Sequence, residues 1–140
     1  KMLYDICIMA GYSGKTLLQK LGFKKGQLVY FKNTPPEYHK ALGVIPEGMF
    51  IAKRLNRPVA AMHCFYTEAK DLVKDTTAFM QYLELNGMLW VSWPKKSSGV
   101  TTDITEQTLR DILLPLNLVD IKVCAVTDVW SGLKFVWRKK

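Results

Sequence analysis

The sequence predicts a single α/β domain in which layers of helices enclose an open, mostly parallel β-sheet that closes on an antiparallel hairpin. Strand-like apolar runs alternate with helical patterns along 140 residues, a length suited to one compact domain. Two runs, 58–66 and 88–93, are apolar without alternation, as expected of parallel strands buried on both faces. The runs 119–126 and 133–138 flank a tight turn at 128–132, which is typical of an antiparallel pair.

A short helix is expected near the start of the domain. Leu17, Leu18 and Leu21 recur at helical spacing and share one side of it. Ser13 is placed to cap this helix and Gly22 to end it.

A strand at 27–31 should follow this helix. The two prolines of "NTPPEYHKALG" suit the start of another short helix, which should end at Gly43. A weak strand is expected at 49–53, ahead of the buried strand 58–66. The elements therefore alternate as a βαβ fold requires.

The most regular helical pattern covers about 67–86, and Gly87 is placed to stop it. Asp103 and Glu106 form a box-like start for the last helix. Pro115 should end or bend that helix, because proline lacks the N–H that a helix interior needs.

The chain is basic, with a formal net charge of +8 and a pI near 9.4. Such a surplus favours anionic partners, among them nucleotides, nucleic acid and acidic lipid headgroups. The lysines are scattered, however, and no nucleic-acid-binding signature accompanies them. A small anionic ligand is therefore the first expectation and nucleic acid the weaker one, while the oligomeric state is left open.

The cysteines indicate a reduced, cytoplasmic protein. Cys7, Cys64 and Cys124 are odd in number and lack the spacing of a disulfide framework or zinc site. No apolar run is long enough to cross a membrane, and the first ten residues lack the features of a signal peptide. We expect 9–140 to form the domain and 1–8 to be an extension ahead of Met9.

The order of elements resembles the Rossmann-like fold of S-adenosylmethionine-dependent methyltransferases in a shortened form. Four segments, "MAGYSGKTLLQKLG", "GMLWVSWPKKSSGVTTDIT", "LVDIKVCAV" and "WSGLKFVWR", also resemble a family of small bacterial proteins, domain of unknown function 3052. This second resemblance spans most of residues 9–138 and is weakest over 32–57. It supports the fold and implies no particular activity.

Loops rich in Ser, Gly and Lys are expected to meet at one edge of the sheet. Ligands of parallel α/β sheets bind beyond the carboxyl ends of the strands, and the start of the first helix, the loop 94–103 and the turn 128–132 all belong there. Backbone N–H groups, lysines and aromatic faces at this edge suit a nucleotide-like anion. The candidate ligand-binding residues are Tyr12, Ser13, Gly14, Lys15, Trp93, Lys95, Lys96, Ser97, Ser98, Gly99, Trp130, Ser131 and Gly132.

Plainer interpretations stand beside that hypothesis. The loop 94–103 also fits a simple connector between strand and helix, and Trp93 at the end of an apolar strand favours a core position. His63 lies in an apolar strand, where a hydrogen-bonded core histidine is more common than a catalytic base. No catalytic residues and no metal site are predicted.

The turn after the first strand counts against S-adenosylmethionine as the cofactor. Its approach to the backbone needs glycines there, and the ribose needs an acid after the second strand. The sequence has "KNTPPEY" in the first place and Lys53 and Arg54 in the second. A degenerate methyltransferase-like domain is therefore preferred, and an active methyltransferase with an unusual cofactor loop or a basic interaction module are the alternatives.

Overall fold

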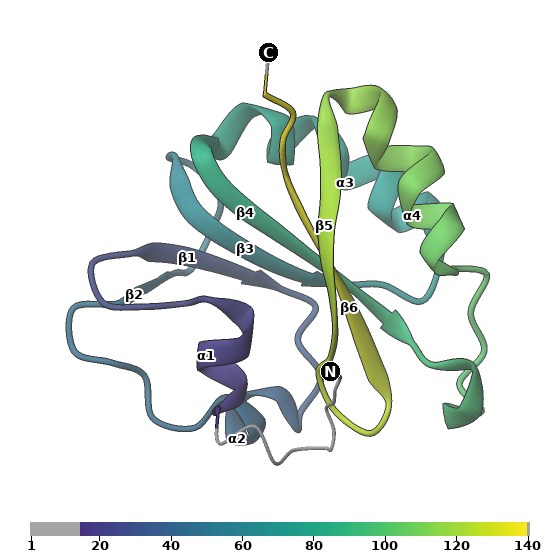
Figure 1. Ribbon diagram of the computed structural model, residues 1–140, viewed down its shortest axis with the longest axis horizontal. Helices are drawn as coiled ribbons and strands as arrows, with labels where there is room; N and C mark the ends of the chain where they lie inside the picture. Colours follow the sequence, from purple (N-terminus) through teal and green to yellow (C-terminus); the bar gives the residue numbers. More distant parts are fainter. Residues whose placement is uncertain (1–14, 140) are drawn as a thin grey trace.

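A computed structural model describes residues 15–139 as a six-stranded sheet with helices on both faces (Figure 1). The elements in chain order are α1 (Leu17–Leu21), β1 (Leu28–Lys32), α2 (Tyr38–Leu42), β2 (Phe50–Ala52), β3 (Val59–Phe65), α3 (Ala69–Tyr82), β4 (Leu83–Pro94), the 3-10 helix η1 (Lys96–Ser98), α4 (Glu106–Leu113), the 3-10 helix η2 (Leu114–Leu116), β5 (Leu118–Ala125) and β6 (Trp130–Trp137).

The strand order is β2-β1-β3-β4-β6-β5. β2, β1, β3 and β4 pair in parallel, and β6 is antiparallel to both of its neighbours. This confirms the predicted α/β class and the C-terminal hairpin. The antiparallel strand β6 lies between β4 and β5, so β5 forms the edge of the sheet. β4 can hold β6 there because its apolar run is buried on both faces and needs a partner on each side.

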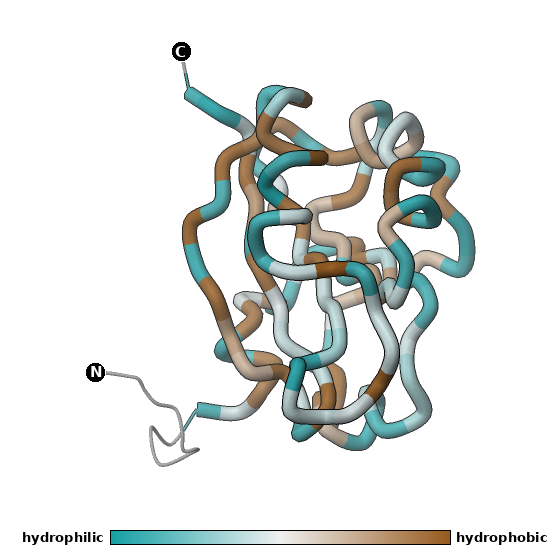
Figure 2. The backbone as a smooth tube through the Cα atoms, turned by 90° about the vertical axis from the view of Figure 1, so that its right-hand side faces the viewer, coloured by the Kyte–Doolittle hydropathy of each residue, from teal (hydrophilic) through white to brown (hydrophobic). Residues whose placement is uncertain are grey.

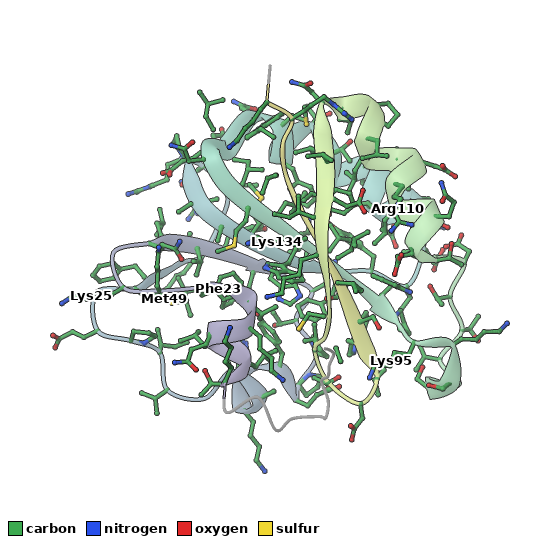
Figure 3. The ribbon with its side chains drawn as sticks, in the orientation of Figure 1. Phe23, Lys25, Met49, Lys95, Arg110 and Lys134 are labelled. Atoms are coloured by element: carbon green, nitrogen blue, oxygen red, sulfur yellow. The ribbon has the colours of Figure 1, made fainter. Side chains whose placement is uncertain are left out.

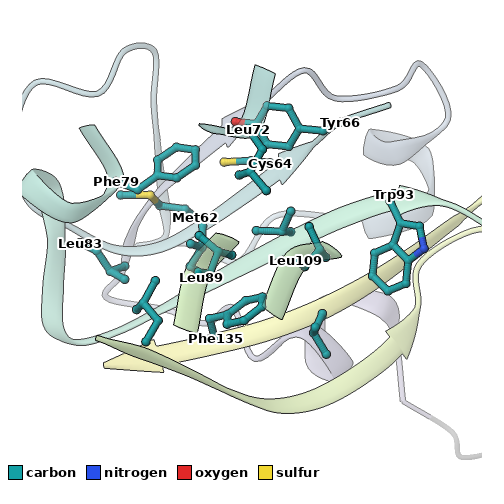
Figure 4. Packing of buried hydrophobic residues seen from close by; sticks show 14 of the residues in the cluster. Met62, Cys64, Tyr66, Leu72, Phe79, Leu83, Leu89, Trp93, Leu109 and Phe135 are labelled. Atoms are coloured by element: carbon teal, nitrogen blue, oxygen red, sulfur yellow. The ribbon is translucent and has the colours of Figure 1, made fainter. Parts of the chain in front are cut away.

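Two hydrophobic clusters fill the spaces between the sheet and its helices. One packs α3 and α4 against β3, β4 and β6, with Met62, Leu72, Leu89, Leu109 and Phe135 among its members (Figure 4). The other packs α1 and α2 against the opposite face. Hydrophobic and hydrophilic segments alternate along the backbone (Figure 2). The sheet is therefore the middle layer of three.

The first short helix begins later than predicted. Thr16 is its N-cap and forms a capping box with Gln19, while the expected cap, Ser13, lies outside the described residues. Gly22 ends the helix in a left-handed conformation, with φ +83°, as predicted. In the described chain the local Thr-x-x-Gln pattern therefore sets the helix start.

The long helix α3 stops at Tyr82, five residues before Gly87, which lies in β4. Leu83 already pairs with Val59 of β3, so sheet pairing ends the helix before the glycine is reached. A Cβ atom at Gly87 would lie 2.8 Å from both the Glu84 carbonyl oxygen and Leu83 Cδ1. Close packing, rather than a helix stop, requires glycine there.

The cap expected for α4 belongs to α3. Thr105 is the N-cap of α4 and forms its capping box with Thr108. Asp103 Oδ1 instead accepts a hydrogen bond of 2.8 Å from the backbone N–H of Ala69, the first residue of α3. Tertiary packing brings Asp103 to this free N–H, which the sequence pattern alone does not show.

The hairpin turn is shorter than the predicted 128–132, since β6 already begins at Trp130. The N–H of Val126 donates to the carbonyl of Trp130 at 2.9 Å, and the Thr127 hydroxyl accepts from the N–H of Trp130 at 3.1 Å. These two bonds close the turn over three residues. Ser131 and Gly132 are therefore paired strand residues.

Candidate functional site

The carboxyl ends of β1 and β3 lie side by side at the point where the chain changes direction across the sheet. From β1 the chain proceeds to β2 on one side, and it then returns to β3 on the other side. Helices consequently leave these two neighbouring ends on opposite faces, which opens a crevice between them. Asn33, which directly follows β1, adopts φ +58° and turns the chain away at this edge.

A pocket of about 290 Å³ occupies this crevice. We call it the rim pocket, and its lining residues are Asn33, Phe65, Tyr66, Thr67, Asp71 and Trp130. Trp130 crosses Phe65 edge to face at 5.3 Å, and Asn33 Nδ2 donates to the Phe65 carbonyl at 3.0 Å. The aromatic wall and the end of β1 are thus both held against the end of β3.

Asp71 supplies the charge in the pocket. It lies in the first turn of α3, where an acid also suits the helix dipole. Its carboxylate makes no hydrogen bond or ion pair within residues 15–139. A half-buried carboxylate accepts hydrogen bonds and attracts cations, so it favours ligand groups that donate.

A second carboxylate beside the pocket is fully engaged. Asp75 accepts a 2.6 Å hydrogen bond from the Tyr66 hydroxyl and pairs with Lys32 Nζ at 2.9 Å. Burial raises the pKa of Tyr66, and its neighbours Cys64 and Asp75 raise it further, so the phenol stays protonated and donates. The network fastens α3 to β1 and β3 and gives the rim pocket a rigid floor.

The predicted site residues at the start of the first helix are only partly described. Tyr12, Ser13 and Gly14 lie outside the described residues, and Lys15 is exposed just before α1. Of the remaining candidates, Trp130 lines the rim pocket.

Three other candidates, Trp93, Ser131 and Gly132, do not line the rim pocket and are instead part of the sheet and core. Trp93 is 9% exposed and packs in the cluster under α3 and α4. Gly132 is buried, and a Cβ there would lie 3.1 Å from Ser92 Oγ. Ser131 pairs with Trp93 and Ala125 in the sheet. These three positions contribute to the sheet from which the site is built.

The loop after β4 is folded on itself and tied at both ends. The Lys95 N–H donates to the Val129 carbonyl at 2.7 Å, next to Trp130, and Ser98 Oγ donates to the Lys95 carbonyl at 2.7 Å. At its far end Thr102 Oγ1 donates to the Thr67 carbonyl at 2.6 Å. The loop therefore adjoins the rim pocket at both ends without lining it.

The middle of that loop faces solvent. Lys96, Ser97 and Gly99 are exposed, and Gly99 ends η1 with φ +78°. The hydroxyl of Ser98 is used inside the turn. A ligand anion would therefore meet Lys95, Lys96 and Ser97 at the outer side of the loop.

Five of the six pocket residues were not among the predicted site residues: Asn33, Phe65, Tyr66, Thr67 and Asp71. Asn33 and Thr67 follow predicted strands, and the rule that strand ends meet at one edge points to them. Asp71 gave no such signal, because an acid in a first helical turn is ordinary.

A hydrogen-bonded chain of Tyr38, His63 and Ser92 lies in the core and resembles a catalytic array in composition alone. Tyr38 Oη and Ser92 Oγ each lie 2.7 Å from one ring nitrogen of His63. Relative exposure is 0% for all three residues, and burial lowers the pKa of His63 to about 3. The imidazole is therefore neutral and out of reach of any substrate, as expected of a core histidine.

Metal and membrane features are absent from the described chain. Within residues 15–139, no group of His, Cys, Asp and Glu side chains is arranged to hold a metal ion. In the same range, none of the helices has the length and apolar character that crossing a bilayer requires.

Solved structures of methyltransferases share this architecture. A SAM-dependent methyltransferase from Aquifex aeolicus matches with a TM-score of 0.61 at 14% identity, over 85% of this chain and 86% of its own. A putative type 11 methyltransferase from Sulfolobus solfataricus gives 0.56 at 13% identity, over 89% and 90%. The ribosomal protein L11 methylase from Lactobacillus delbrueckii subsp. bulgaricus gives 0.54 at 11% identity, over 88% and 76%.

The chain therefore has a methyltransferase-like fold, which confirms the architectural resemblance predicted from the sequence. No family model matches the chain, and no curated protein matches its sequence. The resemblance to domain of unknown function 3052 is accordingly not confirmed. At these identities the similarity establishes the fold alone.

Proposed function

We propose that the chain is a small-molecule-binding domain on a methyltransferase-like fold, and that the rim pocket holds a nucleoside-like group. The position of the pocket is the observation that supports this most strongly. It lies at the crevice between β1 and β3, where open α/β sheets bind nucleotides, and it combines an aromatic wall with an unpaired carboxylate.

Each chemical group in the pocket suits one part of a nucleoside. Trp130 offers a flat face on which a base can stack. Asp71 accepts hydrogen bonds only, which matches the vicinal hydroxyls of a ribose. The volume of about 290 Å³ is near the lower end for small-ligand pockets and suits a group of nucleoside size.

An anionic part of the ligand would lie outside the pocket. Asp71 repels phosphate, and Asp103 already occupies the free N–H at the start of α3. The Lys95 N–H donates to the carbonyl of Val129, the residue next to the Trp130 wall. A nucleotide would therefore direct its phosphate toward Lys95 and the outer side of the loop after β4.

The turn after β1 supports binding without methyl transfer. Asn33 is the one residue of this turn with a left-handed conformation, and the next part of the turn, which leads into α2, contains the buried Pro35. The Pro35 carbonyl accepts the Tyr38 N–H at 3.0 Å, which closes the turn. A turn filled in this way leaves less room beside the backbone than glycines would, so an active methyltransferase is the alternative outcome.

Thermal unfolding with adenosine, AMP, S-adenosylmethionine and S-adenosylhomocysteine tests the proposal. A ligand at 100 times its Kd adds about 2.7 kcal/mol, which should raise Tm by roughly 10 °C. We expect adenosine and AMP to raise Tm, and Asp71→Asn to weaken both by about 10-fold or more, the value of a hydrogen bond to a charged group. Asp111→Asn, an exposed α4 acid, is the matched control and should bind normally.

The outcomes separate the candidates. If none of the four compounds raises Tm at millimolar concentration, or if Asp71→Asn and Asp111→Asn behave alike, the rim pocket is not the nucleoside site. A saturable shift with S-adenosylmethionine at far lower concentration than with adenosine, together with methyl transfer, would establish the active methyltransferase instead.

A further inference from the structure

We infer that one face of the β5–β6 hairpin is a docking surface for the phosphate backbone of single-stranded nucleic acid. Four lysines carry it, Lys20, Lys95, Lys122 and Lys134, and we call them the lysine face. The inference rests on their placement and on Trp130 at one end of the row, and it does not depend on the identity of a small ligand in the rim pocket.

The four lysines come from distant parts of the chain; Lys20, Lys95 and Lys122 lie around Cys124, and Lys134 lies beside Lys122. Lys122 on β5 and Lys134 on β6 are directly opposite each other in the sheet. Lys122 Nζ donates to the carbonyl of Lys20 in the last turn of α1 at 3.1 Å, which brings α1 to this face. Burial raises the pKa of Cys124, and the nearby charges of Lys20, Lys122 and Lys95 each act to lower it. Figure 3 shows Lys95 and Lys134 near the hairpin, away from Arg110 on α4.

This gathering of positive charge is not neutralised within the described chain. Among residues 15–139, none of the four lysines forms an ion pair, whereas Lys32, Lys70 and Arg110 each pair with a nearby carboxylate. Like charges directly opposite each other in a sheet are destabilising. Burial, and then repulsion from Lys122, lowers the pKa of Lys134. An anion on this face would relieve that repulsion.

An aromatic side chain continues the row. Trp130, Gly132 and Lys134 alternate along β6 and so share one face, with Trp130 about 13 Å from Lys134 at the usual strand rise. A positively charged track beside an aromatic platform is how proteins hold single strands, with bases stacked and phosphates paired. Gly132 between them is buried against Trp90 and Val126, so Trp130 and Lys134 are the two ends of the row.

A membrane surface fits this face less well. Docking on a bilayer needs apolar side chains beside the charges. The exposed Val123 of β5 pairs with Leu133 of the α3–α4 cluster, so it points to the opposite side of the sheet. The lysine face therefore offers charge and one aromatic ring, which suits a nucleic-acid strand.

Fluorescence anisotropy with a labelled 20-nucleotide oligothymidylate tests the inference at 50 and 200 mM salt. Each phosphate contact on a single strand contributes about −0.7 to the slope of log K against log salt concentration. Relative to 1 M salt, where this term vanishes, one contact therefore strengthens binding about 8-fold at 50 mM. Lys95→Gln with Lys134→Gln should therefore weaken binding about 60-fold at 50 mM and about 10-fold at 200 mM. Lys70→Gln with Lys74→Gln on α3 removes the same charge and should change binding less than about threefold.

Two further variants complete the test. Trp130→Leu should weaken binding without changing the salt slope, because stacking releases no counterions. If circular dichroism shows that Lys134→Gln is unfolded, Lys20→Gln with Lys95→Gln takes its place and should reduce the slope by the same amount. The melting shift with adenosine, which carries no phosphate, should persist in the lysine variants and keeps this inference separate from the rim pocket.

Equal losses in the two double variants would mean that overall charge, and not this face, binds the strand, and would overturn the inference. So would a wild-type chain that does not bind the oligonucleotide at 50 mM salt. Binding to phosphatidylserine vesicles but not to the oligonucleotide, lost in the lysine-face variant, would assign the face to membranes instead.

Discussion

Acid should weaken the fold through His63, because the folded chain holds this imidazole uncharged in its core. Burial lowers the pKa of His63 to about 3, against 6.5 in the unfolded chain. The unfolded chain binds the proton more tightly than the folded chain does. The stability that the neutral His63 contributes is therefore fully present above pH 6.5 and is lost as the pH falls toward 3. Two pH units at about 1.36 kcal/mol each give a loss of about 2.7 kcal/mol at pH 4.5.

Urea unfolding of the wild type and of His63→Gln, each at pH 7 and pH 4.5, measures this contribution. Glutamine can hydrogen-bond to Tyr38 and Ser92 but does not titrate. Carboxylates affect both proteins alike, so the wild type should lose about 2.7 kcal/mol more than the variant between the two pH values. Equal losses would mean that the imidazole is not a buried neutral group, and the reasoning would fail.

Three other perturbations probe packing, capping and exposure. Gly87→Ala should lower the unfolding free energy by about 1–3 kcal/mol in urea titrations, because its Cβ has no room; a neutral effect would show that β4 can shift. Asp103→Ala should cost about 1 kcal/mol and loosen amide exchange at Ala69 in α3, and loosening confined to α4 would contradict the assignment of the cap. In the native state a thiol reagent should modify half-buried Cys124 well before fully buried Cys64, and the reverse order would contradict the burial of β3.

The order of elements could be predicted because each strand or helix carries its own periodicity. The run 58–66 became β3 at 59–65, since continuous apolar residues need burial on both faces. The end of α3 could not be predicted in the same way. Leu83 continues the helical spacing and, with Leu85, also begins an alternating one, and only the pairing of Leu83 with β3 decides between the two.

The edge of the sheet at which the candidate site lies could be predicted, but most of the residues that line it could not. The rule for parallel sheets located the edge and, with it, Trp130. The roles of Asp71 and Asp103 depend on which helix start faces which loop, and the contact that decides this joins residues 34 positions apart. Such a long-range contact cannot be predicted from local sequence patterns.

The placement of β6 has a consequence for how the molecule assembles. The last strand of the described chain fills the space between β4 and β5, so Trp90 and its neighbours on β4 are without their second partner until residues 130–137 arrive. Such long-range closure makes sheet formation slow and leaves an unpaired edge during synthesis. Nascent chains that stop before Trp130 should consequently need chaperone protection, and full cooperativity should develop only with the final strand.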